Sequence, residues 1–258
     1  MRDIEKYQKI YLQDAEDFER YQVFYRRKKI LELYAEYRAR RVVEIGCGME
    51  PLFAFVPAES FERWVVVEPA DAFYQAACDT AKGDERICCL HMFFGNDNDS
   101  VEQCRVQSGG ANDLVICTGL LHELEHPDQV LKAIHSLCTP MTHVIFNVPN
   151  ADSLHRVLGM WSGYIENVHE LTERNQELQQ HSVYDRGSFA KLLEESGFMV
   201  EKTGTFFIKP FTHRQMAACL KYGILNQRIL DGLYRLSEDL PDFGSELYAV
   251  CRLVDGRG

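Results

Sequence analysis

A short apolar run that ends in two closely spaced glycines constrains this chain more than any other feature. It covers residues 42–48, with the sequence VVEIGCG. The run predicts a buried strand, and the glycines allow a sharp turn and a close approach of a ligand to the main chain. Glu68 stands twenty residues after Gly48, at the end of a second apolar run. A carboxylate there accepts hydrogen bonds from both ribose hydroxyls, so the segment predicts an adenosine-type ligand without a 2′-phosphate.

Apolar runs and helical stretches alternate along the chain. Five runs without clean alternation predict strands buried on both faces, at residues 41–46, 64–68, 87–94, 114–117 and 143–148. Helices are expected at 71–81, 100–106, 128–138 and 188–196, and two more strands at 199–208 and 246–254. Strands that alternate with helices indicate βαβ units. We therefore expect an α/β protein with a doubly wound, seven-stranded, mostly parallel sheet.

Three segments do not fit the sheet and are expected to cover it. Residues 1–40 predict an N-terminal helical cap, ahead of a main domain over 41–258. Helical insertions are expected at about 150–183 and 209–245, and Trp161 and Tyr164 of the first are expected to help close the ligand pocket.

The turn favours a cationic ligand over a pyrophosphate. Pro51 stands where a dinucleotide turn has its third glycine, and Glu44 precedes the first glycine by two residues. A carboxylate there repels a pyrophosphate and attracts an amino group or a sulfonium. A purely structural glycine turn is the alternative interpretation.

Four motifs in order resemble those of the class I S-adenosylmethionine-dependent methyltransferases. They are VVEIGCG (42–48), WVVVEP (64–69), NDLVICTGLLHELEHP (112–127) and HVIFNVPN (143–150), and the resemblance covers about residues 40–208 and the last strand. It implies a Rossmann-like methyltransferase fold and S-adenosyl-L-methionine as cofactor. Residues 147–156 and 180–185 further resemble a subgroup of bacterial small-molecule methyltransferases of antibiotic, sugar or surface-polysaccharide pathways.

The resemblance also implies the residues that bind the cofactor. Glu44, Gly46, Cys47 and Gly48 would line its methionine end. The ribose would lie at Glu68 and Pro69, the adenine at Phe94 and Gly95 with Asp97 as a further candidate, and the sulfonium above Thr118, Gly119 and Leu120.

Three histidines are candidates for the methyl acceptor's side of the site. His155 is our first choice for a general base or an acceptor-orienting residue, because a neutral imidazole removes a proton from a hydroxyl or an ammonium near pH 7. His122 follows the fourth strand, and His181 lies in the first insertion. For each, a purely structural role is the alternative.

The composition limits the kinds of molecule that the protein is expected to bind. The chain has 28 Lys and Arg against 39 Asp and Glu, a net charge of −11, which argues against nucleic acids and anionic membranes. We expect a small-molecule acceptor, with a homodimer left open. Nine scattered cysteines without a C-x-x-C pair, a charged N-terminus and no apolar stretch of about 18 residues predict a cytoplasmic protein with reduced thiols. No metal site is expected, because His and acidic residues lack paired ligand spacing.

The function that follows is methyl transfer to oxygen or nitrogen of a sugar or a natural-product intermediate, as part of biosynthesis. Two alternatives stay open. One is a NAD-dependent oxidoreductase on a similar fold, which the missing third glycine and Glu44 disfavour. The other is a catalytically silent, cofactor-binding partner protein.

Overall fold

One seven-stranded sheet organises the chain. The computed structural model describes residues 4–5, 18–95 and 98–254. The strands are β1 (Arg41–Ile45), β2 (Arg63–Val67), β3 (Ile87–Leu90), β4 (Leu114–Thr118), β5 (His143–Pro149), β6 (Phe198–Ile208) and β7 (Gly244–Leu253). They lie in the order β3-β2-β1-β4-β5-β7-β6. The first five are parallel, and β7 runs antiparallel to both β5 and β6. The predicted doubly wound, mostly parallel sheet is confirmed.

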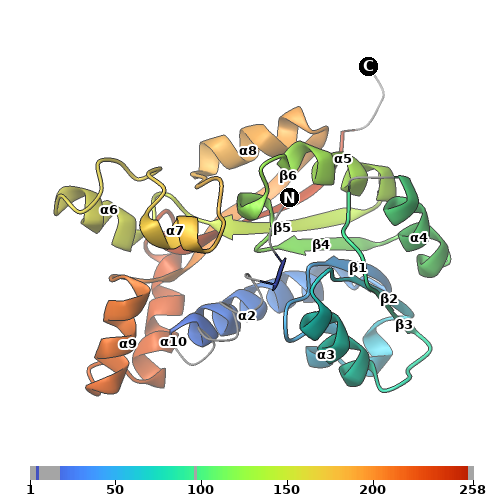
Figure 1. Cartoon of the computed structure of the whole chain (residues 1–258), viewed down its shortest axis with the longest axis horizontal. Coiled ribbons are helices and arrows are strands. Elements are labelled where there is room, and N and C mark those ends of the chain that lie inside the picture. The colour runs from blue at the N-terminus through green and yellow to red at the C-terminus, as the bar shows by residue number, and fades with distance from the viewer. Residues whose placement is uncertain (1–3, 6–17, 96–97, 255–258) are drawn as a thin grey trace.

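Helices cover both faces of this sheet (Figure 1). They are α2 (Glu19–Tyr37), α3 (Asp71–Ala81), α4 (Asn98–Ser108), α5 (Pro127–Leu137), α6 (Leu154–Trp161), α7 (Glu173–Glu177), α8 (Arg186–Glu195), α9 (His213–Lys221) and α10 (Gln227–Arg235). Short 3₁₀ turns are η1 (Leu52–Phe55), η2 (Ala58–Ser60), η3 (Leu121–Glu123) and η4 (Leu236–Glu238). Buried side chains of α4, α5 and α8 pack on one face, and those of α2, η1 and α3 on the other. A third apolar cluster joins α2 to β6, α9 and α10.

The place of β7 brings distant segments to one edge of the sheet. Glu246 of β7 pairs with Pro149 at the end of β5, and Gly244 pairs with Ile208 at the end of β6. The carboxyl ends of β5 and β6 therefore meet the amino end of β7. Segments that follow β4, β5 and β6 all start from this edge, where ligands of open α/β sheets bind.

The third strand is shorter than predicted. It ends at Leu90 and not at Phe94, because its last pair is Val67 with Leu90 and its only neighbour, β2, ends there. Residues 91–94 leave the sheet, although Phe94 stays buried. The N-terminal segment is helical at residues 4–5 and through α2; residues 6–17 of the predicted cap, and Asp97, lie outside the described residues.

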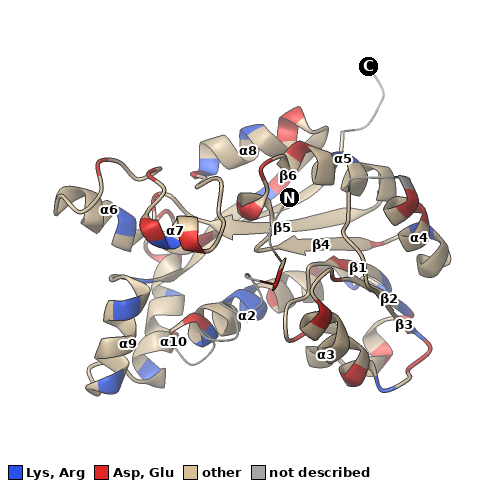
Figure 2. Ribbon diagram, viewed as in Figure 1, with Lys and Arg blue, Asp and Glu red and all other residues tan. Residues whose placement is uncertain are grey.

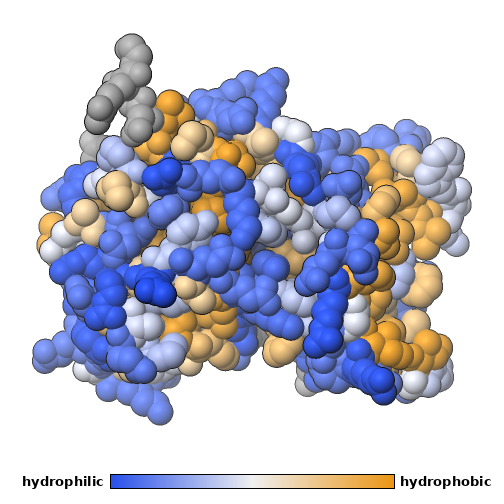
Figure 3. Space-filling view, turned by 180° about the vertical axis from the view of Figure 1, so that it is seen from behind, coloured by the Kyte–Doolittle hydropathy of each residue, from blue (hydrophilic) through white to orange (hydrophobic). Residues whose placement is uncertain are grey.

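Charged side chains and exposed apolar side chains are distributed differently over the molecule. Figure 2 shows acidic and basic residues interspersed over α2, α4, α7 and α8. Exposed apolar side chains are prominent at the end of the molecule that holds α6 and α9 (Figure 3). Trp161 is 81% exposed and Tyr164 is 83% exposed, so neither closes a pocket within the described part of the chain. No helix among residues 4–5, 18–95 and 98–254 has the length and apolar character needed to cross a membrane.

Candidate active site

A cleft opens at the carboxyl ends of β1, β2 and β4, with α2 as one wall. It holds about 950 Å³ of empty space, counting the open solvent at its mouth. Nine of the eleven predicted cofactor-binding residues line it, namely Glu44, Gly46, Cys47, Gly48, Glu68, Pro69, Thr118, Gly119 and Leu120. Other lining residues are Ile4, Val23, Arg26, Arg27, Ile30, Met49, Glu50, Leu52, Ala70, Phe73 and Glu123.

The glycine turn after β1 adopts the backbone conformation for which glycine is needed. Gly46 and Gly48 have φ of 74° and 61°, and open space surrounds the position of a Cβ at each. The Gly46 N–H donates to the carbonyl oxygen of Val67, 2.9 Å away, which ties the turn to β2. The main chain therefore borders the cleft directly at this turn.

Glu44 is a buried carboxylate beneath the turn. It is 3% exposed and accepts hydrogen bonds from the backbone N–H of Leu52 (3.1 and 3.2 Å to the two oxygens) and from Nε1 of Trp64 (3.0 Å). Burial raises the pKa of Glu44 to about 7, and the charge of Glu68 adds to the rise, against the lowering effect of these hydrogen bonds. Burial of the charged carboxylate is unfavourable, and a bound cation would stabilise it. The sequence predicts a cationic ligand at this position.

Glu68 connects the two turns that form the floor of the cleft. Its Oε2 accepts the Gly48 N–H at 3.2 Å, and its Oε1 accepts the Ala70 N–H at 2.9 Å. The side chain is 4% exposed and still borders the cleft. Each carboxylate oxygen accepts more than one hydrogen bond, and Oε2 also accepts one from the Cys47 thiol at 3.8 Å.

Phe94 and Gly95 do not line the cleft. Phe94 belongs to the apolar cluster beneath α5. Gly95 has φ of 105°, and a Cβ placed there would lie 2.9 Å from the Cα of Val130 in α5. The requirement for glycine at this position therefore comes from helix packing. Phe73 of α3 lines the cleft instead and offers an aromatic ring that the sequence analysis missed.

The segment after β4 forms the other side of the floor. Gly119 has φ of 68°, and its N–H donates to the carbonyl oxygen of Asn147 in β5 at 3.0 Å. A Cβ at Gly119 would lie 3.4 Å from a guanidinium nitrogen of Arg26. The Arg26 guanidinium thus reaches from α2 to the main chain at Gly119.

Two of the three candidate histidines lie close to one another. The carbonyl oxygen of His122 accepts the backbone N–H groups of His181 (2.9 Å) and Ser182 (3.2 Å), which fastens the first insertion to the end of β4. The His122 side chain is buried, and its Nε2 lies 3.8 Å from Oε1 of Glu123, a residue that lines the cleft.

His155 lies in α6, among basic groups from other elements. Its Nδ1 is buried and has no hydrogen-bond partner within the described ranges. Burial lowers the pKa of His155 well below its usual range, and the nearby Lys209, His213 and Arg156 lower it further. The imidazole is therefore neutral near pH 7, the form that accepts a proton.

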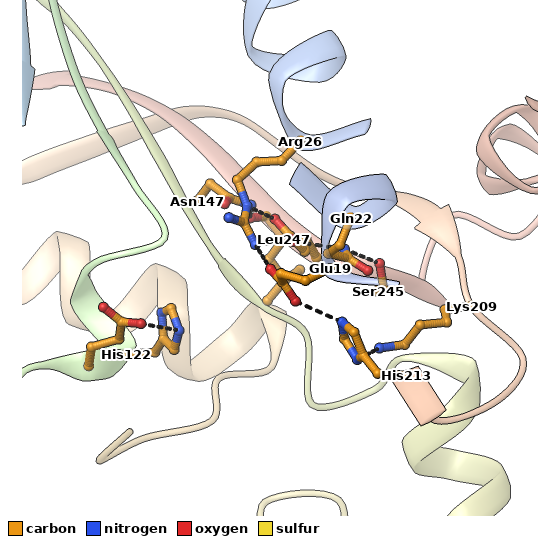
Figure 4. A network of polar contacts seen from close by, with 11 residues as sticks. Glu19, Gln22, Arg26, His122, Asn147, Lys209, His213, Ser245 and Leu247 are labelled. Carbon is orange, nitrogen blue, oxygen red and sulfur yellow. Dashed lines mark hydrogen bonds and ion pairs between the residues drawn. The ribbon is translucent and has the colours of Figure 1, made fainter. Parts of the chain in front are cut away.

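A chain of buried and partly buried charged side chains starts at Lys209, directly after β6. Its Nζ lies 2.8 Å from Nδ1 of His213, whose Nε2 lies 2.9 Å from Oε2 of Glu19 in α2. Oε1 of Glu19 lies 4.0 Å from Arg26, which donates to both oxygens of Glu246 at 2.6 and 2.8 Å. Figure 4 shows this network running from Lys209 to Arg26, beside Asn147.

Burial controls the protonation of this chain. It lowers the pKa of Lys209 to about 7, although Glu19 and Glu246 act in the opposite direction. Burial alone would raise the pKa of Glu19, but the hydrogen bond from His213 and the surrounding positive charges lower it to about 2. The chain links α2 to β7 and α9, so it holds the wall of the cleft in place.

Sequence reasoning missed most of this network, although one signal was available. Lys209 directly follows the apolar end of β6, just as Glu68 follows β2. The other members come from helices or from inside β7, where nothing local marks them.

No group of three or more His, Cys, Asp or Glu side chains suited to a metal occurs in the described ranges.

Comparison with known proteins identifies the family. A family model of the methyltransferase domain matches residues 18–203. A search of curated proteins found no match. Among solved structures, an S-adenosylmethionine-dependent methyltransferase from Mesorhizobium loti has 16% sequence identity and a TM-score of 0.54, with 83% of this chain and 90% of that chain covered.

Two further structures share the fold. N-methyltransferase NodS from Bradyrhizobium japonicum WM9, in complex with S-adenosyl-L-homocysteine, has 13% identity and a TM-score of 0.52, with 89% of this chain and 86% of that chain covered. The mitomycin 7-O-methyltransferase MmcR has 16% identity and a TM-score of 0.51, with 84% of this chain and 50% of that chain covered. The family model spans more than two thirds of the chain, so this protein belongs to the methyltransferase-domain family, and its predicted resemblance to the class I S-adenosylmethionine-dependent methyltransferases is confirmed.

Proposed function

We propose that this protein transfers a methyl group from S-adenosyl-L-methionine to an oxygen or nitrogen atom of a small molecule, in a biosynthetic pathway. The observation that carries the proposal is the pair of buried carboxylates, Glu44 and Glu68, on the floor of one cleft. They suit a ligand that combines positive charge with a free ribose. The neighbours described as O- and N-methyltransferases support both acceptor atoms equally.

The residues of the cleft divide between the parts of this cofactor. Glu44 and the Gly46–Gly48 turn would hold the methionine end, and Glu68 the ribose. Phe73, at the α3 side of the cleft, is a better placed candidate for the adenine than Phe94. When bound, the cofactor supplies a methyl group on a positively charged sulfur, so the protein has to bind, orient and exclude water.

The acceptor would enter at the edge where β4, β5 and β6 end. His155 is the candidate base there, because its imidazole is neutral and its Nδ1 has no partner in the described part of the chain. An alcohol must lose its proton during methyl transfer, whereas a neutral amine loses it afterwards. His122 and His181 would shape the opposite side of the entrance.

Calorimetric titration of the purified chain with S-adenosyl-L-methionine, S-adenosyl-L-homocysteine and NAD tests the cofactor. We expect binding of the first two and none of NAD. Glu68→Ala should abolish or severely weaken binding. Glu62→Ala, an exposed acid before the same strand, is the matched control and should bind as the wild type does. Binding of NAD alone would favour an oxidoreductase and refute the proposal.

An acceptor screen that detects S-adenosyl-L-homocysteine then tests transfer. Any methylated product excludes a catalytically silent partner protein. Sedimentation of the same sample tests whether the chain forms the homodimer that the sequence analysis left open.

A further inference from the structure

Two exposed apolar turns, called the first and second tip below, stand at one end of the molecule. The first tip ends α6, where Trp161 is 81% exposed and Tyr164 is 83% exposed. The second tip joins α9 to α10, where Tyr222 is 75% exposed and Ile224 is 64% exposed. These side chains are therefore almost fully open to water, although each has a large apolar surface.

Each tip is a tight turn around a glycine with a positive φ. Gly163 and Gly223 have φ of 73° and 71°, and a Cβ at either position would meet open space. The helices that carry the tips, α6 and the pair α9 and α10, lie at the same end of the molecule, on the left in Figure 1. Figure 3 shows exposed apolar side chains at this end. The two tips can therefore contact one extended surface together.

Acidic residues are missing from the sequence of both tips, although the chain has 39 of them. No charged residue occurs between Arg156 and Glu166, the stretch that contains the first tip. The second tip lies between Glu201 and Asp231, and every charged residue in that stretch is basic. They are Lys202, Lys209, Arg214, Lys221 and Arg228.

The exposed cations near the second tip have no acidic partner among the described residues. Arg214, Lys221 and Arg228 are exposed, and none of them forms an ion pair within 4.0 Å in that part of the chain. Exposed cations elsewhere do form such pairs, for example Arg86 with Asp84 at 2.6 Å. Unpaired cations beside apolar side chains are complementary to a surface that is both anionic and apolar.

A membrane with anionic lipids is such a surface. Trp and Tyr favour the boundary between headgroups and acyl chains, because each joins an apolar ring to a polar N–H or O–H. Lys and Arg attract anionic headgroups. A protein interface buries one contiguous apolar core, whereas these side chains stand on two separate turns.

The net charge of −11, from which we expected no anionic membrane as partner, does not decide this contact. Ions screen charges beyond about 8 Å at physiological ionic strength, so the charges next to the membrane dominate. Those charges are basic at the second tip and absent from the first.

We propose that this end of the molecule docks on the surface of a membrane that contains anionic lipids, with both tips in the headgroup region. The segments that carry the tips follow β5 and β6, so docking turns the carboxyl edge of the sheet toward the membrane. The inference goes beyond the proposed function and does not depend on it, because none of the four apolar side chains of the tips lines the cleft.

Tryptophan fluorescence of the purified chain tests the contact directly. Of its two tryptophans, Trp64 is 0% exposed, so a change on adding vesicles reports on Trp161. Vesicles of equimolar phosphatidylcholine and phosphatidylglycerol should shift the emission maximum to shorter wavelength, because the indole ring leaves water. Vesicles of phosphatidylcholine alone should cause a smaller shift. Trp161→Phe should lose the shift and still co-sediment with the mixed vesicles.

Single substitutions connect binding to the tips. Tyr164→Ser and Ile224→Ser should each weaken co-sedimentation with the mixed vesicles about tenfold, the effect of one apolar side chain left in water. Lys221→Gln and Arg228→Gln should each weaken it about fivefold, and binding to phosphatidylcholine alone should not change. Met141→Ser is the matched control, because Met141 is 75% exposed and precedes β5, at the opposite edge of the sheet. It should bind as the wild type does.

No binding to the mixed vesicles would overturn the proposal. Equal binding to both kinds of vesicle, or wild-type binding by all four tip variants, would overturn it as well. Sedimentation velocity without vesicles tests a second copy of the chain as the alternative occupant. If vesicles do not bind and a dimer is present that Ile224→Ser dissociates, the second tip serves self-association instead. No cofactor is present in these assays, so failure to bind S-adenosyl-L-methionine would refute the proposed function alone.

Discussion

Replacing Lys209 by methionine should remove a pH dependence from the stability of this protein. Lys209 is 3% exposed, and burial lowers its pKa from 10.5 to about 7, against the charges of Glu19 and Glu246. In the unfolded chain the pKa returns to its ordinary value. Between pH 7 and 10.5 the unfolded state therefore binds more protons than the folded state, and the stability of the wild type rises with pH in this window.

The magnitude follows from the two pKa values. Each pH unit within the window changes the free energy of unfolding by up to about 1.4 kcal/mol. From pH 7.5 to 9.0 the contribution of Lys209 amounts to about 2 kcal/mol, and Lys209→Met lacks it. The stability of the wild type relative to the variant should therefore rise by about 2 kcal/mol over this range.

Urea denaturation of both proteins at the two pH values measures this difference. Buried cysteines such as Cys117, whose pKa burial raises to about 12, also make stability depend on pH, but their contribution cancels between wild type and variant. Lys202→Met is the matched control, because Lys202 is half-exposed and its bond to Glu36 raises its pKa, outside the window. The pH dependence of this control should equal that of the wild type. Parallel pH dependence for Lys209→Met and wild type would refute the reasoning.

Three further predictions concern Gly95, His155 and Glu44. Gly95→Ala should lower the free energy of unfolding, measured by urea denaturation, by about 2–4 kcal/mol, because the φ of 105° and the contact with Val130 both oppose a Cβ. Gly163→Ala, with φ of 73° and open space, should lower it by only about 1 kcal/mol. His155→Ala should lower turnover while cofactor affinity in calorimetry stays nearly unchanged; an equal loss of both would remove His155 as the base. Calorimetric affinity for S-adenosyl-L-methionine should rise from pH 6 to pH 8 as Glu44, with its pKa of about 7, loses its proton; a flat profile would argue against contact between Glu44 and a cation.

The parts of the site that could be predicted from sequence are those in which a short segment determines the geometry. Glu44 and Gly46 share one strand-to-turn segment, and Glu68 directly follows the next strand, which pairs with β1 in parallel. Their proximity follows from the pairing of consecutive strands, so the sequence spacing is sufficient. The predicted length of β3 was wrong because apolar character does not determine where strand pairing stops. Apolar character continues to Phe94, but pairing stops where β2 stops.

The contacts at the end of β5 could not be predicted in this way, because the residues that make them are far apart in sequence. Gln22 and Glu246 are separated by 224 positions, and they meet only because β7 inserts antiparallel between β5 and β6. That insertion brings the start of β7 to the end of β5, where α2 lies across it. A carboxylate inside a strand and an amide inside a charged helix give no local sign of such a contact.

The same topology explains why the cofactor and the acceptor would be recognised by different kinds of chemistry. The floor of the cleft consists of turns after parallel strands, where main-chain N–H groups donate hydrogen bonds to two buried carboxylates. The neighbouring edge lies where the sheet becomes antiparallel, and side chains from α2 and from the segment after β6 lie there. Because α2 borders both regions through Arg26 and Gln22, a change at this edge can displace a wall of the cleft.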